Sequence, residues 1–280
     1  MENEVRQIQL KCLEILRCVD TICRRHNIAY SLCGGSVVGA HLYGKCLPWD
    51  DDIDLMMTRE NYNRFLSVAK EELPVGFSIH NYTLSDDFTT TFTKIMNDNT
   101  TVVQQDETVS GVFLDITVYD RLPNDFRKQI VILLWKLSQI AMIGTMGNIG
   151  IKNRIRNLLL KTILKDKRAY LCFAQKRVER LGKCRNYSYA EVFGAYCNTK
   201  PFVSEIFENY TEIAFEGDNY EIVRDYVRYL ETRYDRTDFY EPPEKQIAPH
   251  YKFVDLKKPY RTYLGGLSHN TGNQRNCTCL

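Results

Sequence analysis

Apolar side chains recur every three to four residues along the first 25 positions, which is the period of a helix with one buried face. The positions are Val5, Ile8, Cys12, Ile15, Leu16, Val19, Ile22 and Cys23. This pattern predicts an amphipathic helix that ends near His26-Asn27.

Short segments rich in β-branched and aromatic residues follow, and they predict strands within the first 120 residues. We expect strands over 30–33, 53–57, 77–81, 92–96, 101–103 and 113–118. Between them we expect a tight turn at Gly34-Gly35-Ser36, a short helix over 37–42, and a helix over 60–72 that Thr58 caps.

The pattern becomes helical after Leu122-Pro123, with helices predicted over 127–145, 151–164 and 167–181. A mixed region over 187–215 and a helix over 220–234 follow, and the Gly/Asn/Thr-rich segment 265–280 predicts a disordered tail. Strands that come first and helices that come later indicate an α+β fold, with a mixed β-sheet core, flanking helices and a helical insertion.

Composition excludes several classes of protein. The chain has 280 residues, enough for one large domain with a full core. Its net charge of +2, from 37 basic and 35 acidic residues, gives no global field for binding nucleic acid. The segment 152–185 is nevertheless rich in Lys and Arg with apolar residues between them. This segment is either a solvated helical face or a surface for an anionic membrane or a charged glycan.

The sequence predicts a cytoplasmic location. The amino-terminal MENEVRQIQL lacks the apolar stretch of a secretory signal, and the ten irregularly spaced cysteines fit a reducing compartment. The longest apolar stretch, 130–143, is too short and too polar to span a bilayer. If the basic segment binds lipid, peripheral association with the inner membrane face follows.

The segment 48–55, PWDDDIDL, places four carboxylates within five residues. On a strand, Asp50, Asp52 and Asp54 would project to one side and Asp51 to the other. An acidic surface turn is the alternative, but the apolar flanks favour a half-buried strand. Because such charges repel one another, we expect a hard divalent cation, Mg²⁺ or Mn²⁺, on Asp52 and Asp54 with Asp50 beside them.

Asp115 lies inside the apolar strand pattern 113–116, FLDI, where an unpaired charge is costly. It is either hydrogen-bonded structurally or faces the same metal from a neighbouring strand. Asp120, at the end of that strand, is a weaker candidate. Upstream, Gly34, Gly35 and Ser36 lie between a predicted strand and a helix, where backbone N–H groups favour a phosphate.

Gly34-Gly35-Ser36 followed by Asp52-Ile53-Asp54 resembles the signature of the nucleotidyltransferase fold. The longer stretch 35–65, GSVVGAHLYGKCLPWDDDIDLMMTRENYNRF, resembles the LicD family, which includes bacterial phosphocholine transferases and domains of fukutin and fukutin-related protein. Further similarities are KI at 94–95 before NTT at 99–101, FLDITVYD at 113–120, and Tyr234 followed by PPEK at 242–245.

The resemblance implies a single catalytic domain over 1–264, with a nucleotidyltransferase-like core over about 28–122 and a helical and mixed region over about 124–264. It implies transfer of phosphocholine or a polyol phosphate from a CDP-activated donor to a hydroxyl of a cell-surface glycan or glycolipid, with release of CMP. The implied catalytic and metal residues are Asp52, Asp54 and Asp115, with Asp50 as a further ligand. Gly34, Gly35, Ser36 and Lys94 would contact the donor phosphates, and Asp115 or Asp50 would accept the hydroxyl proton.

One departure from the family pattern concerns the run before the acidic segment. Leu42 stands where the family usually has Arg, so Lys45 or Lys94 would have to supply that charge. Three other classes stay open: a nucleotidyltransferase that releases pyrophosphate, a glycosyltransferase with an Asp-x-Asp motif, and a binding scaffold without chemistry.

Overall fold

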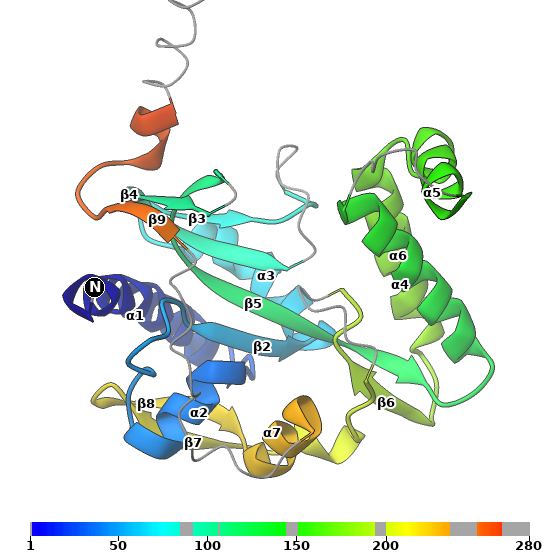
Figure 1. Cartoon of the computed structure of the whole chain (residues 1–280). Coiled ribbons are helices and arrows are strands. Elements are labelled where there is room, and N and C mark those ends of the chain that lie inside the picture. The colour runs from blue at the N-terminus through cyan, green and yellow to red at the C-terminus, as the bar shows by residue number, and fades with distance from the viewer. Residues whose placement is uncertain are drawn as a thin grey trace, which may run out of the picture.

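A central mixed sheet flanked by helices forms the body of the protein, which confirms the predicted α+β class (Figure 1). The computed structural model describes residues 2–84, 92–105, 107–143, 151–193, 200–235 and 251–264. The predicted tail over 265–280 and the PPEK run at 242–245 lie outside these residues.

Seven strands of the described residues form the main sheet, in the order β1-β2-β5-β4-β3, with β6 added to β5 and β9 added to β4. Their bounds are β1 Ser31–Leu32, β2 Asp54–Thr58, β3 Phe77–His80, β4 Thr93–Gln104, β5 Val109–Pro123, β6 Tyr187–Ala190 and β9 Tyr251–Asp255. The β2–β5 pair is parallel and the other pairs are antiparallel. A separate hairpin joins β7 Tyr210–Phe215 to β8 Asp218–Val223.

The helices confirm most of the periodicity predictions. Their bounds are α1 Glu2–Arg25, α2 Gly34–Tyr43, α3 Arg59–Glu72, α4 Arg127–Ile143, α5 Ile151–Lys161, α6 Lys167–Leu181, the 3₁₀ helix η1 Ser204–Phe207, and α7 Tyr226–Tyr234. The apolar face of α1 packs on the sheet, where Cys12 and Leu16 are fully buried and the Cys12 thiol contacts the Phe113 carbonyl at 3.4 Å. Thr58 caps α3 as predicted, accepting from the Asn61 amide.

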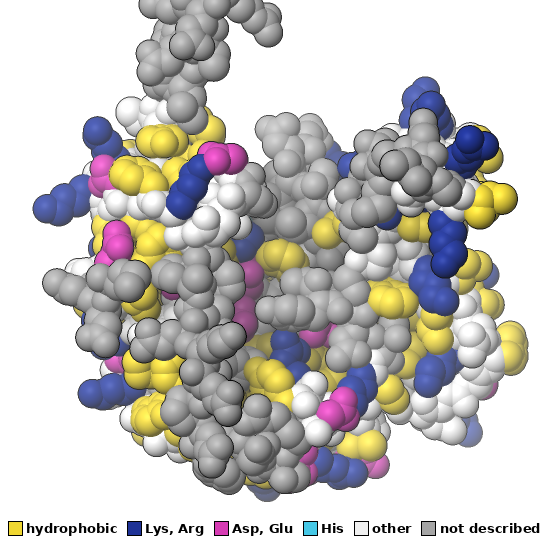
Figure 2. Space-filling view, in the orientation of Figure 1, with side chains coloured by type: hydrophobic (Ala, Val, Ile, Leu, Met, Phe, Trp, Pro, Cys, Tyr) yellow, Lys and Arg dark blue, Asp and Glu magenta, His cyan; other side chains and the backbone are white. Residues whose placement is uncertain are grey.

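The segment after Pro123 has a hydrophobic core of its own. Helices α4, α5 and α6 form an arm beside the sheet, with α5 at its outer end (Figure 1). The apolar residues between them, including Val131, Ala174 and Val178, form a cluster separate from the one that α1 shares with the sheet. Along this arm Lys and Arg side chains alternate with hydrophobic ones (Figure 2).

Two predictions of secondary structure are wrong in part. The strands predicted over 92–96 and 101–103 are one strand, β4, whose register shifts between Asn97 and Val102. The helix predicted over 220–234 begins only at Tyr226, because Asp218–Val223 is β8. Glu216 and Gly217 both have positive φ, 55° and 86°, as in the tight turns that suit twisted hairpins.

Within the described ranges, no helix is both long and apolar enough to cross a bilayer.

Candidate functional site

Asp54 and Asp115 lie side by side at the centre of the sheet. The parallel register of β2 and β5 pairs these two residues directly, and paired residues on neighbouring strands are about 4.8 Å apart. In-register residues project from the same face of a sheet. The backbone pairing therefore brings Asp115 next to Asp54 of the Asp-x-Asp segment, as the sequence predicted.

Lys94 continues this row on the next strand. It pairs with Asp115 across β4 and β5, and its Nζ lies 3.0 Å from Oδ1 and 3.2 Å from Oδ2 of that carboxylate. The two side chains are only 10% and 17% exposed. Lys94 Nζ also lies over the Phe113 ring. The ammonium group thus offsets part of the charge on Asp115 in a largely dry environment.

The loop before β2 adds three more carboxylates. Oxygen atoms of Asp50, Asp51 and Asp52 all lie within 4.8 Å of one another. The expectation that Asp51 points away is wrong, because residues 50–53 precede the strand and do not follow its alternation. The Gln9 side chain on α1 fixes this loop by donating to the carbonyls of Leu47 and Asp50, at 2.9 and 2.7 Å.

The electrostatics of the group oppose its full ionisation. Burial raises the pKa of Asp54 well above its usual range, and the charges of Asp52, Asp115 and Asp50 raise it further, while Arg233 opposes the shift. Burial raises the pKa of Asp115 to about 6, against the effect of Lys94. Carboxylate oxygens gathered in this way are the donor set that Mg²⁺ or Mn²⁺ prefers, so the residues fit the predicted metal.

Gly34, Gly35 and Ser36 form the first turn of α2 and pack against the acidic residues. Gly34 has a φ of 54°, a conformation that side chains rarely adopt, and a Cβ there would lie 3.6 Å from Oδ2 of Asp54. A Cβ on Gly35 would collide with the Asp50 carboxylate. The Ser36 hydroxyl accepts a hydrogen bond from the Asp54 amide at 3.0 Å, so this serine positions the start of β2.

Arg233 is a site residue that sequence reasoning missed. A Cβ on Gly34 would lie 3.7 Å from Nε of Arg233 and 3.5 Å from the Tyr234 hydroxyl. Arg233 donates to Glu191 Oε2 at 3.0 Å and to the Tyr119 hydroxyl at 3.2 Å. One sequence signal could have identified Arg233. Its neighbour Tyr234 was among the similarities to the LicD family.

Lys45 is not brought to the acidic group. It is exposed and follows Gly44, the residue that caps the carboxyl end of α2, whereas Gly34 begins that helix. Its amide donates to the Gly39 carbonyl at 3.4 Å, so the Lys45 backbone packs beside Gly39, five residues along α2 from Gly34. Of the two lysines expected to replace the family arginine, the structure places only Lys94 beside a carboxylate.

A cavity of about 210 Å³ opens beside the carboxylates. Its polar wall is made by Asp51, Asp52, Lys94 and Asp115. The other lining residues are Gln104 and a largely apolar set, which comprises Ile8, Val102, Val112, Phe113 and Tyr251. Tyr251 comes from β9, for which the sequence predicted no strand. The cavity therefore joins charged and aromatic surfaces.

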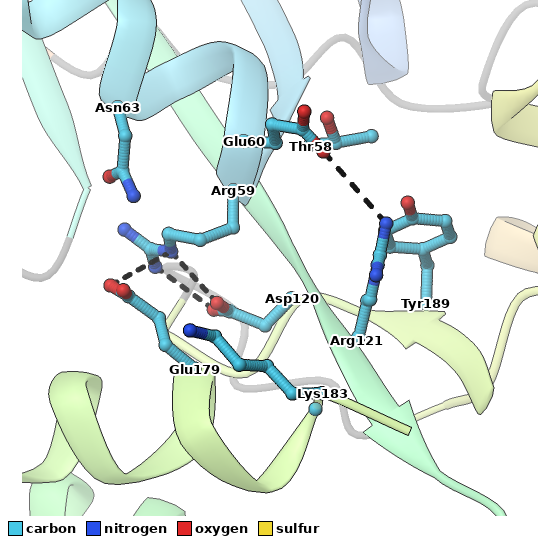
Figure 3. Close-up of a pocket in the computed structure, with 10 residues that line it drawn as sticks. Thr58, Arg59, Glu60, Asn63, Asp120, Arg121, Glu179, Lys183 and Tyr189 are labelled. Carbon is cyan, nitrogen blue, oxygen red and sulfur yellow. Dashed lines mark hydrogen bonds and ion pairs between the residues drawn. The ribbon is translucent and has the colours of Figure 1, made fainter. Parts of the chain in front are cut away.

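Asp120, the weaker candidate, lies in a different place and has a structural partner. It is almost fully buried, and Arg59 donates two hydrogen bonds to its carboxylate, from Nε at 2.8 Å and from Nη2 at 2.9 Å (Figure 3). Glu179 on α6 lies 3.9 Å from the same guanidinium. These charges line a second cavity, of about 310 Å³, and connect α3 and β5 to the helical arm (Figure 3).

Comparison with protein families finds a similarity in the first half of the chain. Residues 27–136 match a family model described as "LicD/FKTN/FKRP, nucleotidyltransferase domain". That range contains Gly34 to Ser36, the aspartates at 50–54, Lys94 and Asp115.

The chain is also similar over most of its length to one characterised protein. It is 29% identical over 258 residues to the lipopolysaccharide cholinephosphotransferase LicD of Haemophilus influenzae. The aligned region covers 88% of this chain and 96% of that protein. On these two findings, residues 27–136 resemble a LicD-type nucleotidyltransferase domain, and most of the chain resembles a lipopolysaccharide cholinephosphotransferase.

Removing Arg59 tests the structural role of Asp120. We expect Arg59→Ala to lower the free energy of unfolding by about 3–5 kcal/mol, because it leaves a buried carboxylate without its partner. Urea unfolding at pH 7 measures this loss. Arg121→Ala is the matched control, since Arg121 is 40% exposed and lies 3.8 Å from Glu60, and it should cost about 1 kcal/mol or less. Equal losses in the two variants would contradict the assignment.

Replacing Asp54 tests the electrostatic strain. Because the raised pKa makes the folded chain hold its proton to higher pH than the unfolded chain, metal-free protein loses stability as pH rises above about 4. Asp54→Asn should therefore raise the free energy of unfolding at pH 7 in the presence of a chelator, and make it depend less on pH. Asp225→Asn, at a half-exposed position, is the control. A variant less stable than the parent at pH 7 would show that the carboxylate is already compensated.

Proposed function

We propose that this protein is a metal-dependent phosphotransferase. It would move a phosphocholine or polyol-phosphate group from a CDP-activated donor to a hydroxyl of a cell-surface glycan, such as lipopolysaccharide, teichoic acid or capsule, and release CMP. The observation that carries this proposal is the pairing of Asp54 with Asp115 beside the cluster of Asp50, Asp51 and Asp52. The similarity to a lipopolysaccharide cholinephosphotransferase supports the substrate class.

The residues that would hold Mg²⁺ or Mn²⁺ are Asp52 and Asp54, with Asp50 and Asp115 completing the oxygen ligands. When bound, such a cation would neutralise the diphosphate and the developing charge on the departing CMP. The backbone of Asp54, which is bonded to the Ser36 hydroxyl and paired with β5, would hold it in position for this role. A ligand held on a strand is better positioned than one on a loop.

The chemistry needs an acceptor hydroxyl, a proton acceptor and an in-line arrangement. The hydroxyl oxygen would attack the distal phosphorus of the diphosphate, and the bond from that phosphorus to the CMP oxygen would break. Asp115, which lines the cavity, would accept the hydroxyl proton where it does not bind the cation, and Asp50 is the alternative acceptor. Lys94, 3.0 Å from the Asp115 carboxylate, holds it in place.

Positive charge for the donor phosphates would come from Lys94 and Arg233. Both side chains are largely buried, and they approach the carboxylates from opposite sides of the row, Lys94 through β4 and Arg233 through α7. Arg233 would thus supply positive charge at the Gly34 end of α2, whereas Leu42 lies near the other end of that helix. Its planar guanidinium, already fixed by Glu191 and Tyr119, suits bidentate contacts with phosphate.

The cavity beside the carboxylates favours choline as the donor head group. A quaternary ammonium group is attracted both by carboxylates and by aromatic rings. Phe113 and Tyr251 line the same cavity as Asp51 and Asp52.

Nucleotide release tests the proposal directly. Purified protein would be incubated with CDP-choline, CDP-glycerol, CDP-ribitol or UDP-sugars, with Mg²⁺ or Mn²⁺ and a pool of glycan acceptors. We expect metal-dependent CMP release that Asp52→Asn and Asp54→Asn abolish and Asp115→Ala reduces at least about 100-fold. Asp225→Asn should be unchanged. Pyrophosphate would instead indicate a nucleotidyltransferase, and UDP a glycosyltransferase.

Arg233 can be tested separately from the metal ligands. Arg233→Lys keeps a charge opposite the buried Glu191 but loses the bidentate geometry, so the KM for the donor should rise about tenfold. Lys45→Ala should leave that KM within about twofold, since Lys45 lies at the far end of α2. Steady-state kinetics with the active donor would decide. A larger effect at Lys45 than at Arg233 would reverse the assignment.

A further inference from the structure

Helix α5 carries a stripe of exposed apolar side chains. Ile151, Ile155 and Leu158 are 74%, 54% and 61% exposed, and their spacing of four and three residues places them within about 60° of the helix circumference. Leu160, on the opposite side of the helix, is buried in the core of the arm. The stripe therefore points away from the body of the protein.

Basic residues border this stripe on both sides. Lys152 lies on one flank, and Arg154 and Lys161 lie on the other, by the same 100° step per residue. The segment 151–165, IKNRIRNLLLKTILK, contains no acidic residue. Ile163, 63% exposed, extends the apolar surface just beyond the helix. An apolar stripe between cationic flanks is the pattern of a helix that lies in a membrane interface.

The place of α5 in the fold suits such a contact. It forms the outer end of the arm, away from the sheet and the carboxylates (Figure 1). Lys and Arg side chains continue along the arm beside hydrophobic ones (Figure 2). A flat surface could therefore reach α5 without displacing the core of the arm or covering the candidate site.

We propose that α5 binds the surface of an anionic phospholipid bilayer. Ile151, Ile155 and Leu158 would enter the boundary between headgroups and acyl chains, while Lys152, Arg154 and Lys161 contact lipid phosphates. A purely solvated helical face does not explain three well-exposed aliphatic side chains on the same side of one helix. A charged glycan would use the basic residues but leave the apolar stripe in water. With eleven residues, α5 lies on the bilayer and does not cross it.

Vesicle binding by the full chain tests this inference without any catalysis. Co-flotation would be measured with phosphatidylcholine vesicles and with equimolar phosphatidylcholine and phosphatidylglycerol. We expect binding to the anionic vesicles that weakens as salt rises. Equal binding to both vesicle types, or none to the anionic ones, would overturn the proposal.

Matched variants assign the binding to α5. The double variant Ile155→Ser/Leu158→Ser should bind at least tenfold more weakly, whereas Val75→Ser, which alters a fully exposed side chain before β3, should bind normally. Lys152→Gln and Arg154→Gln should each weaken binding about fivefold, against Lys70→Gln on α3 as control. Unchanged binding in the α5 variants would refute the assignment.

Two further outcomes distinguish other occupants. If light scattering shows a dimer of the parent that Ile155→Ser dissociates, the stripe contacts a second copy and the membrane proposal fails. Leu158→Trp provides a separate test, because its fluorescence should shift to the blue with anionic vesicles and not with neutral ones. Asp52→Asn should bind vesicles like the parent, so failure of the proposed catalysis and failure of this inference can be told apart.

Discussion

The in-register pairing of β2 with β5 brings two carboxylates together at the centre of the sheet. At about 5 Å and an effective dielectric constant near 20, two such charges repel by about 3 kcal/mol. The surrounding elements are arranged to tolerate this repulsion. On one side, β4 supplies the ammonium group of Lys94. On the other side, the glycines of α2 leave room beside the carboxylates, and α7 supplies Arg233. A divalent cation would complete this balance, so the site favours the ligand on which the proposed chemistry depends.

Asp115 and Asp120 show how one strand can carry two carboxylates with different roles. They are five residues apart on β5, an odd separation that directs them to opposite faces of the sheet. Asp120 accepts two hydrogen bonds from Arg59, which is itself held near Glu179. Asp115 has a single ammonium partner and lines a cavity with Asp51 and Asp52. Two hydrogen bonds from one guanidinium explain a structural role for Asp120, whereas Asp115, beside other carboxylates and a cavity, remains the candidate for the proposed chemistry.

The sequence correctly predicted the elements that depend on local periodicity. Its predictions failed where contacts between distant segments determine the structure. The face of α1, the cap at Thr58 and the bounds of α6 follow from side chains a few residues apart. The meeting of Asp115 with Asp54 was predictable because each lies in an apolar strand pattern. Asp51 was misplaced because alternation was extended to residues that precede the strand. Arg233 joins the site only through the packing of α7 against α2, which local spacing does not encode.

The near-zero net charge conceals a separation of charge within the fold. Five carboxylates gather at the sheet, those of Asp50, Asp51, Asp52, Asp54 and Asp115, whereas the segment 151–165 on the arm is basic without an acidic residue. This separation is possible because the arm has its own core, which anchors α5 through Leu160 and leaves its other face exposed. Long-range attraction of an anionic surface would act on the arm, while the carboxylates keep such a surface away from the sheet. If the arm binds a membrane, orientation as well as attachment would follow from the distribution of charge, and the cavity beside Asp115 would face away from the bilayer.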